Sequence, residues 1–213
     1  MPELFALEAL EGRFVRLLPM ELAHVDALVQ AAGGDRSTFG FTPVPSDRAA
    51  MTEYVERAVA RRRAGDEVPF VTFSAVHRRI VGTTRFYDLT PWEWPPSVPG
   101  SASLQRDDRP DVATIGHTWL DPSAQRSPVN TESKLLMLGH AFEQWGVWAG
   151  RIQTDARNLR SRRAIERLGL TLDGIIRAHM PGVDGTVRDS AVFSMVADEW
   201  PEHRQRLLAR LTG

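Results

Sequence analysis

The sequence predicts one α/β domain over residues 1–213, with a mixed, mostly antiparallel twisted sheet flanked by helices. Three observations support this fold class. The composition, 42% apolar and 25% charged, is that of a globular chain. The length suffices for one sizeable core. Short β-rich runs alternate with segments of helical periodicity, and neither a repeat nor a clear linker divides the chain.

The first part of the chain predicts the order β-α-α-β-β. Apolar residues recur at helical spacing after the first β-rich run, and Gly33 with Gly34 ends that helix. Ser46 is the expected N-cap of a second helix, whose last turn carries three arginines that suit the helix dipole. In order, we expect strand 14–18, helix 20–32, a helix from Ser46 to about Arg63, and a hairpin of strands 69–76 and 80–87.

Residues 88–111 form an expected loop insertion rich in Pro, Ser, Asp and Gly, which is longer than most loops in a compact domain. Trp92 and Trp94 lie within it. One interpretation is a surface insertion whose tryptophans pack against the body. The other is a lid or an oligomer contact, and in this second case we expect Trp92 or Trp94 to shape a binding site.

Regular structure is expected to resume after the insertion. Leu135, Leu138, Phe142 and Trp145 form one apolar stripe at helical spacing, which predicts a core-facing helix. Gly169 is a natural C-cap for the short helix that precedes it. The expected elements are strand 113–120, helix 130–147, strand 151–155, helix 161–168, strands 172–178 and 187–196, and a C-terminal helix 199–211.

Composition excludes several classes of function. The formal net charge of −1 argues against a nucleic-acid partner held by bulk charge. The absence of cysteine excludes disulfides, thiolate metal sites and a cysteine nucleophile, and the scattered histidines form no metal motif, so we expect no metal. The acidic N-terminus and the lack of an uninterrupted apolar stretch of about 18 residues predict a cytoplasmic protein with no membrane partner. Lys134, the single lysine, is interpreted as compositional bias.

The loop after residue 120 leads into a helix N-terminus, where unpaired N–H groups and the helix dipole suit a phosphate or pyrophosphate. Every helix has such an end, so the feature alone is weak. The sequence has neither GxxxxGK[ST] nor GxGxxG, which removes nucleotide hydrolysis and dinucleotide redox chemistry as leading interpretations.

Three runs in this part of the chain resemble the GNAT superfamily of acetyl-CoA-dependent N-acetyltransferases, and within it the RimJ/RimL-type branch. These runs are Gly116 to Pro122, Gln125 to Lys134, and Thr154 to Ile165. The resemblance implies the GNAT fold and acetyl-CoA as cosubstrate. It also implies direct transfer in a ternary complex to a primary amine, either a protein N-terminal α-amine or a small molecule. A homodimer is left open.

The family's Q/R-x-x-G-x-G/A loop corresponds to residues 125–130, where Pro128 and Asn130 replace its two glycines. Pro128 has no N–H to give, whereas neighbouring side chains add donors. The altered loop motivates a second interpretation, a non-catalytic acyl-CoA-binding sensor or scaffold. The cofactor-binding residues implied by the resemblance are Thr118, Trp119, Leu120, Gln125, Arg126, Ser127, Val129, Asn130, Thr131, Asn158, Ser161 and Arg162.

Amide formation requires a neutral amine, and the departing thiolate can take up a proton. By resemblance, Asn158 and Ser161 lie near the cofactor thiol, and Ser161 is the expected proton donor or hydrogen-bond partner of the thiolate. His117 is the expected base because its ordinary pKa is near 6.5. Glu132 and His179 remain alternative bases. Tyr54 and Tyr87, the two tyrosines, lie outside the matching runs.

Overall fold

The computed structural model describes residues 8–106 and 109–212. Its centre is an eight-stranded sheet in the order β1-β2-β3-β4-β5-β6-β8-β7. Neighbouring strands are antiparallel except β5 and β6, which are parallel. The strands are β1 Leu10–Glu11, β2 Val15–Pro19, β3 Val68–Ser74, β4 Arg79–Thr90, β5 Val112–Leu120, β6 Ala149–Asp155, β7 Thr171–Pro181 and β8 Val187–Val196.

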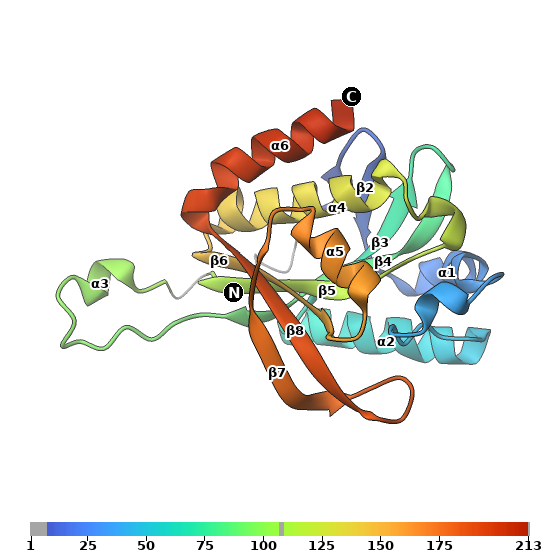
Figure 1. Ribbon diagram of the computed structural model, residues 1–213, viewed down its shortest axis with the longest axis horizontal. Coiled ribbons are helices and arrows are strands. Elements are labelled where there is room, and N and C mark those ends of the chain that lie inside the picture. The colour runs from blue at the N-terminus through green and yellow to red at the C-terminus, as the bar shows by residue number, and fades with distance from the viewer. Residues whose placement is uncertain (1–7, 107–108, 213) are drawn as a thin grey trace.

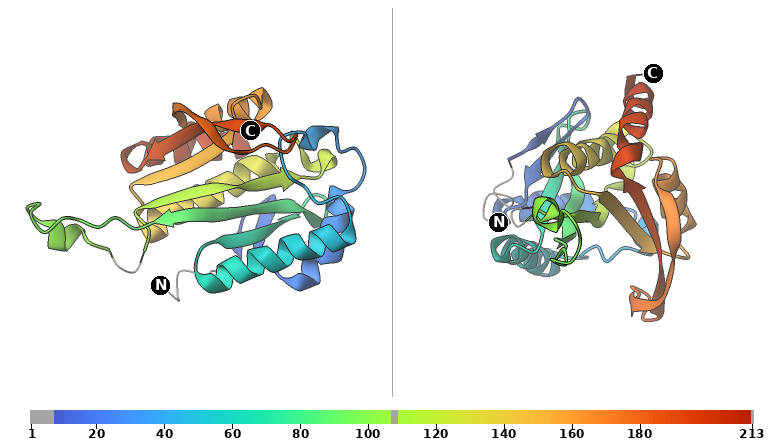
Figure 2. Two further views of the ribbon diagram at one scale, coloured as in Figure 1. Left: turned by 90° about the horizontal axis from the view of Figure 1, so that it is seen from below. Right: turned by 90° about the vertical axis from the view of Figure 1, so that its left-hand side faces the viewer.

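Helices cover both faces of the sheet (Figures 1 and 2). One face carries α1 and α2, and the other carries α4, α5 and α6. The helices are α1 Val25–Ala32, α2 Arg48–Ala64, α3 Ser101–Leu104, α4 Pro128–Gly139, α5 Leu159–Glu166 and α6 Trp200–Thr212. Among the described residues, no helix has both the length and the apolar character needed to cross a bilayer. The arrangement confirms the expected mixed, mostly antiparallel sheet between helices.

Each helical layer has its own apolar core. The larger core joins the strands to α4, α5 and α6 and includes Phe86, Ile115 and Phe193. The smaller core joins α1 and α2 to the sheet and includes Leu28 and Met51. The expected core stripe lies in the larger one, where Leu138 and Trp145 are buried and Leu135 and Phe142 pack against them.

Four of the expected helices begin or end elsewhere. The helix expected at 161–168 with Gly169 as its C-cap is α5, Leu159–Glu166, whose C-cap is Arg167. Asp47, rather than Ser46, caps α2, because its Oδ1 accepts the Ala50 N–H at 2.9 Å. The expected helix 20–32 starts with a 3-10 turn at Leu22–His24, and α1 begins at Val25. The expected helix 130–147 is α4 followed by a π-helix, His140–Trp145, which stops at Gly146 with φ +63°. A π-helix has wider turns than an α-helix, and the spacing of apolar residues along the sequence does not distinguish the two.

The insertion is only partly a loop. β4 continues to Thr90, which pairs with Val112, and α3 lies in the arm that projects from the body (Figure 1). The Asp111 carboxylate accepts the Trp92 N–H at 2.8 Å at the base of this arm. Trp92 and Trp94 pack edge to face with ring centroids 6.0 Å apart. The arm leaves from the N-terminal end of β5, whereas the residues singled out by sequence follow from its C-terminal end.

Candidate active site

The parallel strands β5 and β6 part in the middle of the sheet. They pair from Val112 with Ala149 to Ile115 with Ile152, and no further β5–β6 pair occurs among the described residues. Beyond that point β5 remains paired with β4, and β6 with β8. The segment 116–120 of β5 therefore has a backbone edge that faces an opening between the strands. An extended ligand with amide groups can pair with such an edge.

A β-bulge lies at the point where the strands part. Thr83 pairs with Trp119 and Arg85 with Gly116, so that two residues of β5, His117 and Thr118, lie opposite one residue of β4. His117 adopts a left-handed conformation with φ +49°. The Thr83 hydroxyl donates to the His117 carbonyl oxygen at 3.0 Å, which holds this conformation. The bulge thus fixes the direction of both side chains at the start of the opening.

His117 lies on the face away from α4 and keeps exposed surface. Its ring is edge-on to that of Tyr87, with centroids 5.2 Å apart. Burial of the ring, together with the charges of Arg85 and Arg188, lowers the pKa of His117 to about 4. The imidazole is consequently neutral near pH 7, so it can accept a proton but is a weak base.

Sequence reasoning did not place Tyr87 in this site, but the β4–β5 pairing does. Gln153 on β6 donates to its hydroxyl oxygen at 2.8 Å, and burial raises the pKa of Tyr87 to about 12. A Cβ on Gly116 would lie 2.6 Å from the Tyr87 ring, so a residue without a side chain is needed there. The pairing register between the expected strands 80–87 and 113–120 was the signal that could have located Tyr87.

The loop after β5 starts α4 in a way that accommodates Pro128. Ser127 is the N-cap, and its hydroxyl accepts the Val129 N–H at 3.3 Å. Pro128 occupies the first helical position, where an N–H has no partner within the helix. Arg126 has φ +57°, a conformation that glycine adopts more easily. The first-turn N–H groups of Asn130 and Thr131 lie at the positive end of the α4 dipole.

Four of the expected cofactor-binding side chains serve the fold. Val129 is fully buried in the larger core, and Trp119 and Leu120 are also buried. Gln125 uses its amide to donate to the Leu120 carbonyl at 2.9 Å and to the Thr38 hydroxyl at 3.0 Å. At these four positions the backbone, rather than an exposed side-chain tip, is the part available to a ligand.

Asn158 and Ser161 meet at the start of α5, beside the end of β6. Asn158 is the N-cap, and its Oδ1 accepts the Ser161 N–H at 3.0 Å. Ser161 and Arg162 are half-buried, and Arg162 donates to the Ala156 carbonyl at 3.3 Å. The structure therefore gives Asn158 a capping role and brings Ser161 to the first turn of this helix.

Two carboxylates near the opening are already paired with arginines. Arg157 donates to Asp155 and to Asp184, at 2.7 Å each, and its hydrogen bonds lower the pKa of Asp155. Glu67 pairs with the buried Arg85 at 2.6 Å. Arginine hydrogen bonds occupy both acids, which makes them poor candidates for a general base.

The alternative bases lie elsewhere. Glu132 points to the β1–β2 turn, where its oxygens accept three backbone N–H groups at 2.6–2.9 Å from residues 13–15. His179 on β7 shares a hydrogen bond of 2.9 Å with the Ser190 hydroxyl. Glu132 therefore has a structural role, and His179 is held to the β7–β8 hairpin.

Lys134 on α4 lies beneath the bulge and was missed as a site residue. Its Nζ donates to the Thr118 hydroxyl at 2.7 Å and to the Thr84 hydroxyl at 2.9 Å. Within the described residues no carboxylate pairs with it. Because its amine is fully removed from water, the pKa of Lys134 is lowered to about 7. A lysine with this environment is a candidate for proton transfer.

The residues around the opening fit a phosphate-bearing ligand with an amide-containing arm. The free backbone edge of β5 suits the amide-containing part of such a ligand, and the start of α4 suits a pyrophosphate. Arg126 is exposed directly before the N-cap of α4 and adds positive charge there, whereas Arg163 is exposed in the last turn of α5. Among the described residues, no cluster of three or more His, Asp or Glu side chains forms a metal site.

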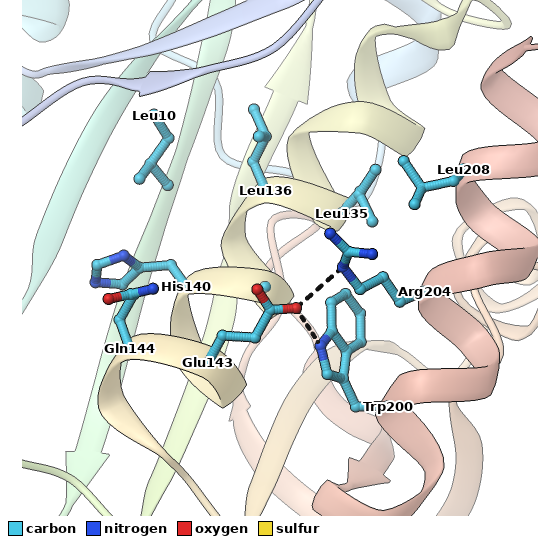
Figure 3. Close-up of a pocket in the computed structure, with 10 residues that line it drawn as sticks. Leu10, Leu135, Leu136, His140, Glu143, Gln144, Trp200, Arg204 and Leu208 are labelled. Carbon is cyan, nitrogen blue, oxygen red and sulfur yellow. Dashed lines mark hydrogen bonds and ion pairs between the residues drawn. The ribbon is translucent and has the colours of Figure 1, made fainter.

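A separate cavity lies on the far side of α4, between α4, the π-helix and α6 (Figure 3). Its volume is about 320 Å³. Glu143 accepts the Trp200 indole N–H at 2.8 Å and pairs with Arg204 at 3.0 Å, and both contacts cross the cavity wall. Neither the bulge nor the α5 N-terminus contributes a residue to this cavity.

Known proteins share the fold and the sequence pattern. Residues 15–171 match the model of the acetyltransferase (GNAT) domain. The chain is 23% identical over 196 residues to "Probable N-acetyltransferase YjcK" of Bacillus subtilis, covering 88% of this chain and 96% of that protein. It superposes on a GCN5-related N-acetyltransferase from Brucella melitensis with a TM-score of 0.78 and 27% identity, covering 95% and 84% of the two chains.

A more distant structure is RimL, described as a ribosomal L7/L12 alpha-N-protein acetyltransferase. It superposes with a TM-score of 0.72 at 17% identity over 89% of this chain and 94% of RimL, which shows a shared fold. The family match covers most of the sheet, the bulge, the α4 loop and α5. The chain therefore belongs to the GNAT family and is an acetyl-CoA-dependent N-acetyltransferase.

Proposed function

We propose that this enzyme acetylates the α-amine of a protein N-terminus, as the RimJ/RimL-type branch does, by direct transfer in a ternary complex. The observation that supports it most is the weak base at the bulge, His117, with a pKa of about 4. An α-amine is roughly 10% neutral at pH 7, whereas a lysine side chain is less than about 0.1% neutral. A weak base therefore suits an α-amine better than a lysine.

Acetyl-CoA supplies the acetyl group as a thioester. In the proposal, the backbone of Thr118, Trp119 and Leu120 holds its pantetheine arm. The loop and first turn of α4 hold its pyrophosphate through Gln125, Arg126, Ser127, Val129, Asn130 and Thr131. Arg162 contributes positive charge at α5. This division follows from the free β5 edge and the helix start described above.

His117 takes the proton from the acceptor nitrogen, directly or through water. Ser161 donates a hydrogen bond to the departing sulfur, and Asn158 keeps Ser161 in place by capping α5. The absence of cysteine fits direct transfer, because no thiol is present to form an acyl intermediate. A cytoplasmic location, a possible homodimer and the absence of nucleic-acid or membrane partners belong to the same proposal.

The altered glycines of the α4 loop were the reason to consider a non-catalytic acyl-CoA sensor. Pro128 occupies the helical position where its missing N–H removes no intrahelical bond. Ser127 and Asn130 provide polar groups at the same turn. No structural observation therefore favours the sensor over the transferase.

The test measures release of free CoA thiol from acetyl-CoA with peptides as acceptors. The matched control is the same peptide with a blocked N-terminus and one internal lysine. We expect turnover above the hydrolysis blank with the free α-amine and little with the control. Turnover on the lysine peptide alone would overturn the acceptor. Calorimetric binding of acetyl-CoA without turnover on a broad panel of amines would support the sensor instead.

A further inference from the structure

The single lysine of the chain is the buried charge that folding explains least. Lys134 is the only lysine among 26 basic residues, and it is 4% exposed. A buried amine without a carboxylate costs stability in its charged form. A methionine would fill much of the same space without that cost. An arginine would keep the charge but cannot release a proton at neutral pH.

One hydrogen bond of the Lys134 amine leads toward the opening between β5 and β6. Nζ donates to two hydroxyls, those of Thr84 and Thr118. These hydroxyls lie 2.8 Å from each other. Thr84 is fully buried, whereas Thr118 is half-buried and follows the bulge residue His117 at the parting of β5 and β6. Of the two, only Thr118 connects the lysine to the opening.

We propose that Lys134 stores the proton for acetyl transfer and delivers it through the Thr118 hydroxyl to the departing sulfur. Lys134 acts through Thr118 and is therefore a positioning residue, whereas Thr118 touches the reacting atoms. The proposal rests on the acetyl transfer proposed above.

The step balances without another reactant. A bond forms between the amine nitrogen and the acetyl carbon, and the carbon–sulfur bond breaks. The sulfur takes the proton of Thr118 Oγ1, which takes one from Lys134 Nζ. The nitrogen loses one proton to His117 or water, and solvent returns one to Lys134. Ser161 then needs only to hydrogen-bond the sulfur.

Burial supports this role because it brings the pKa of Lys134 to about 7, where both forms are populated at neutral pH. The titratable groups on the packed elements face elsewhere. Arg85 and His117 lie on the opposite face of the sheet from α4. Glu132 bonds to the backbone of residues 13–15, and Arg16 on β2 pairs with Glu11 at the surface.

The first test observes the lysine directly in the full chain. Protein labelled with ¹³C at lysine Cε gives one lysine signal, because the chain has one lysine. We expect this signal to titrate near pH 7 and to shift when CoA is added. A midpoint near 10.4, or a signal that does not move at CoA concentrations that calorimetry shows to be saturating, would overturn the proposal.

The second test compares two matched variants, Thr118→Val and Thr84→Val, which each remove one hydroxyl partner of Lys134. We expect Thr118→Val to lower kcat about 10²-fold and Thr84→Val to lower it far less. Lys134→Met should lower kcat as Thr118→Val does and abolish the fall of kcat at alkaline pH. Equal losses in the two threonine variants, or an unchanged pH profile in Lys134→Met, would overturn the proposal.

The two tests separate this proposal from the proposed function. If the wild-type enzyme binds CoA but acetylates no amine, the proposed function fails. The lysine signal still reports whether Lys134 titrates near neutral pH and responds to CoA.

Discussion

Glu132 and Lys134 lie two residues apart on α4, and both are buried, yet their partners differ in kind. The Glu132 carboxylate accepts N–H groups from Arg13, Phe14 and Val15. Lys134 has two hydroxyl partners and no opposite charge among the described residues. A buried charge with a full set of backbone partners is explained by folding. One with few partners, beside an opening, indicates function.

The largest expected effect on stability is at Glu132. Replacing it in Glu132→Ala leaves the N–H groups of the β1–β2 turn without their acceptor, so we expect a loss of about 3 kcal/mol in the free energy of unfolding. Urea denaturation measures it. The matched control is Glu11→Ala, which removes an exposed ion pair and should change stability by less than about 0.5 kcal/mol. Equal losses of stability in the two variants would contradict the structural role of Glu132.

A substitution of Lys134 should change the free energy of unfolding in the opposite direction. Lys134→Met removes a buried charge and should stabilise the protein by about 2 kcal/mol at pH 6. The folded pKa, about 7, lies below the unfolded value near 10.4, so the unfolded chain binds more protons between these values. Wild-type stability therefore rises with pH through this window, and the advantage of Lys134→Met shrinks by pH 9.

Thermal unfolding of both proteins at pH 6 and pH 9 checks the sign. A lower Tm of Lys134→Met at both pH values would mean that Lys134 is as necessary to the fold as Glu132. The contrast between the two residues would then disappear.

His117 extends the comparison to the other face of the bulge. Its folded pKa, about 4, lies below the unfolded value near 6.5, so stability should fall as the pH drops from 6.5 toward 4. His117→Asn should weaken this dependence, and asparagine tolerates the left-handed conformation at this position. Urea denaturation at pH 4.5 and pH 7 measures the difference. The same slope in both proteins would assign the pH dependence to other groups.

The smallest effect is expected at the cap of α5. Asn158→Ala removes the acceptor of the Ser161 N–H and should cost about 1 kcal/mol. Asn158→Asp keeps an acceptor and should retain most of that stability. Chemical denaturation of the two variants separates capping from any role in turnover. Equal stability of Asn158→Ala and the wild type would remove the structural role.

The sequence predicted most of the strands and helices in order, because each of these elements carries a local periodicity. The apolar stripe of α4 and the π-helix after it is an example, since it depends on residues a few positions apart. The two-residue strand β1 and the four-residue helix α3 were not expected, because elements this short carry no periodicity. The family resemblance, confirmed by the match over residues 15–171, pointed to the loop before α4.

Features that depend on strand pairing were not predictable in this way. The ring centroids of Tyr87 and His117 lie 5.2 Å apart only because of the β4–β5 register and its bulge. Lys134 was interpreted as compositional bias, because nothing in its neighbours along the chain shows that its amine is buried beneath another strand. The same applies to Glu132, whose partners are about 120 residues away along the chain.

The arm between β4 and β5 has a consequence for engineering. It leaves and re-enters the sheet at Thr90 and Val112, which are paired neighbours on adjacent strands. Facing residues of paired strands lie about 5 Å apart, a distance that a short turn can span. The segment between them is therefore a natural position to exchange for a compact turn, or to carry an inserted reporter domain, while the register of the catalytic strand stays fixed.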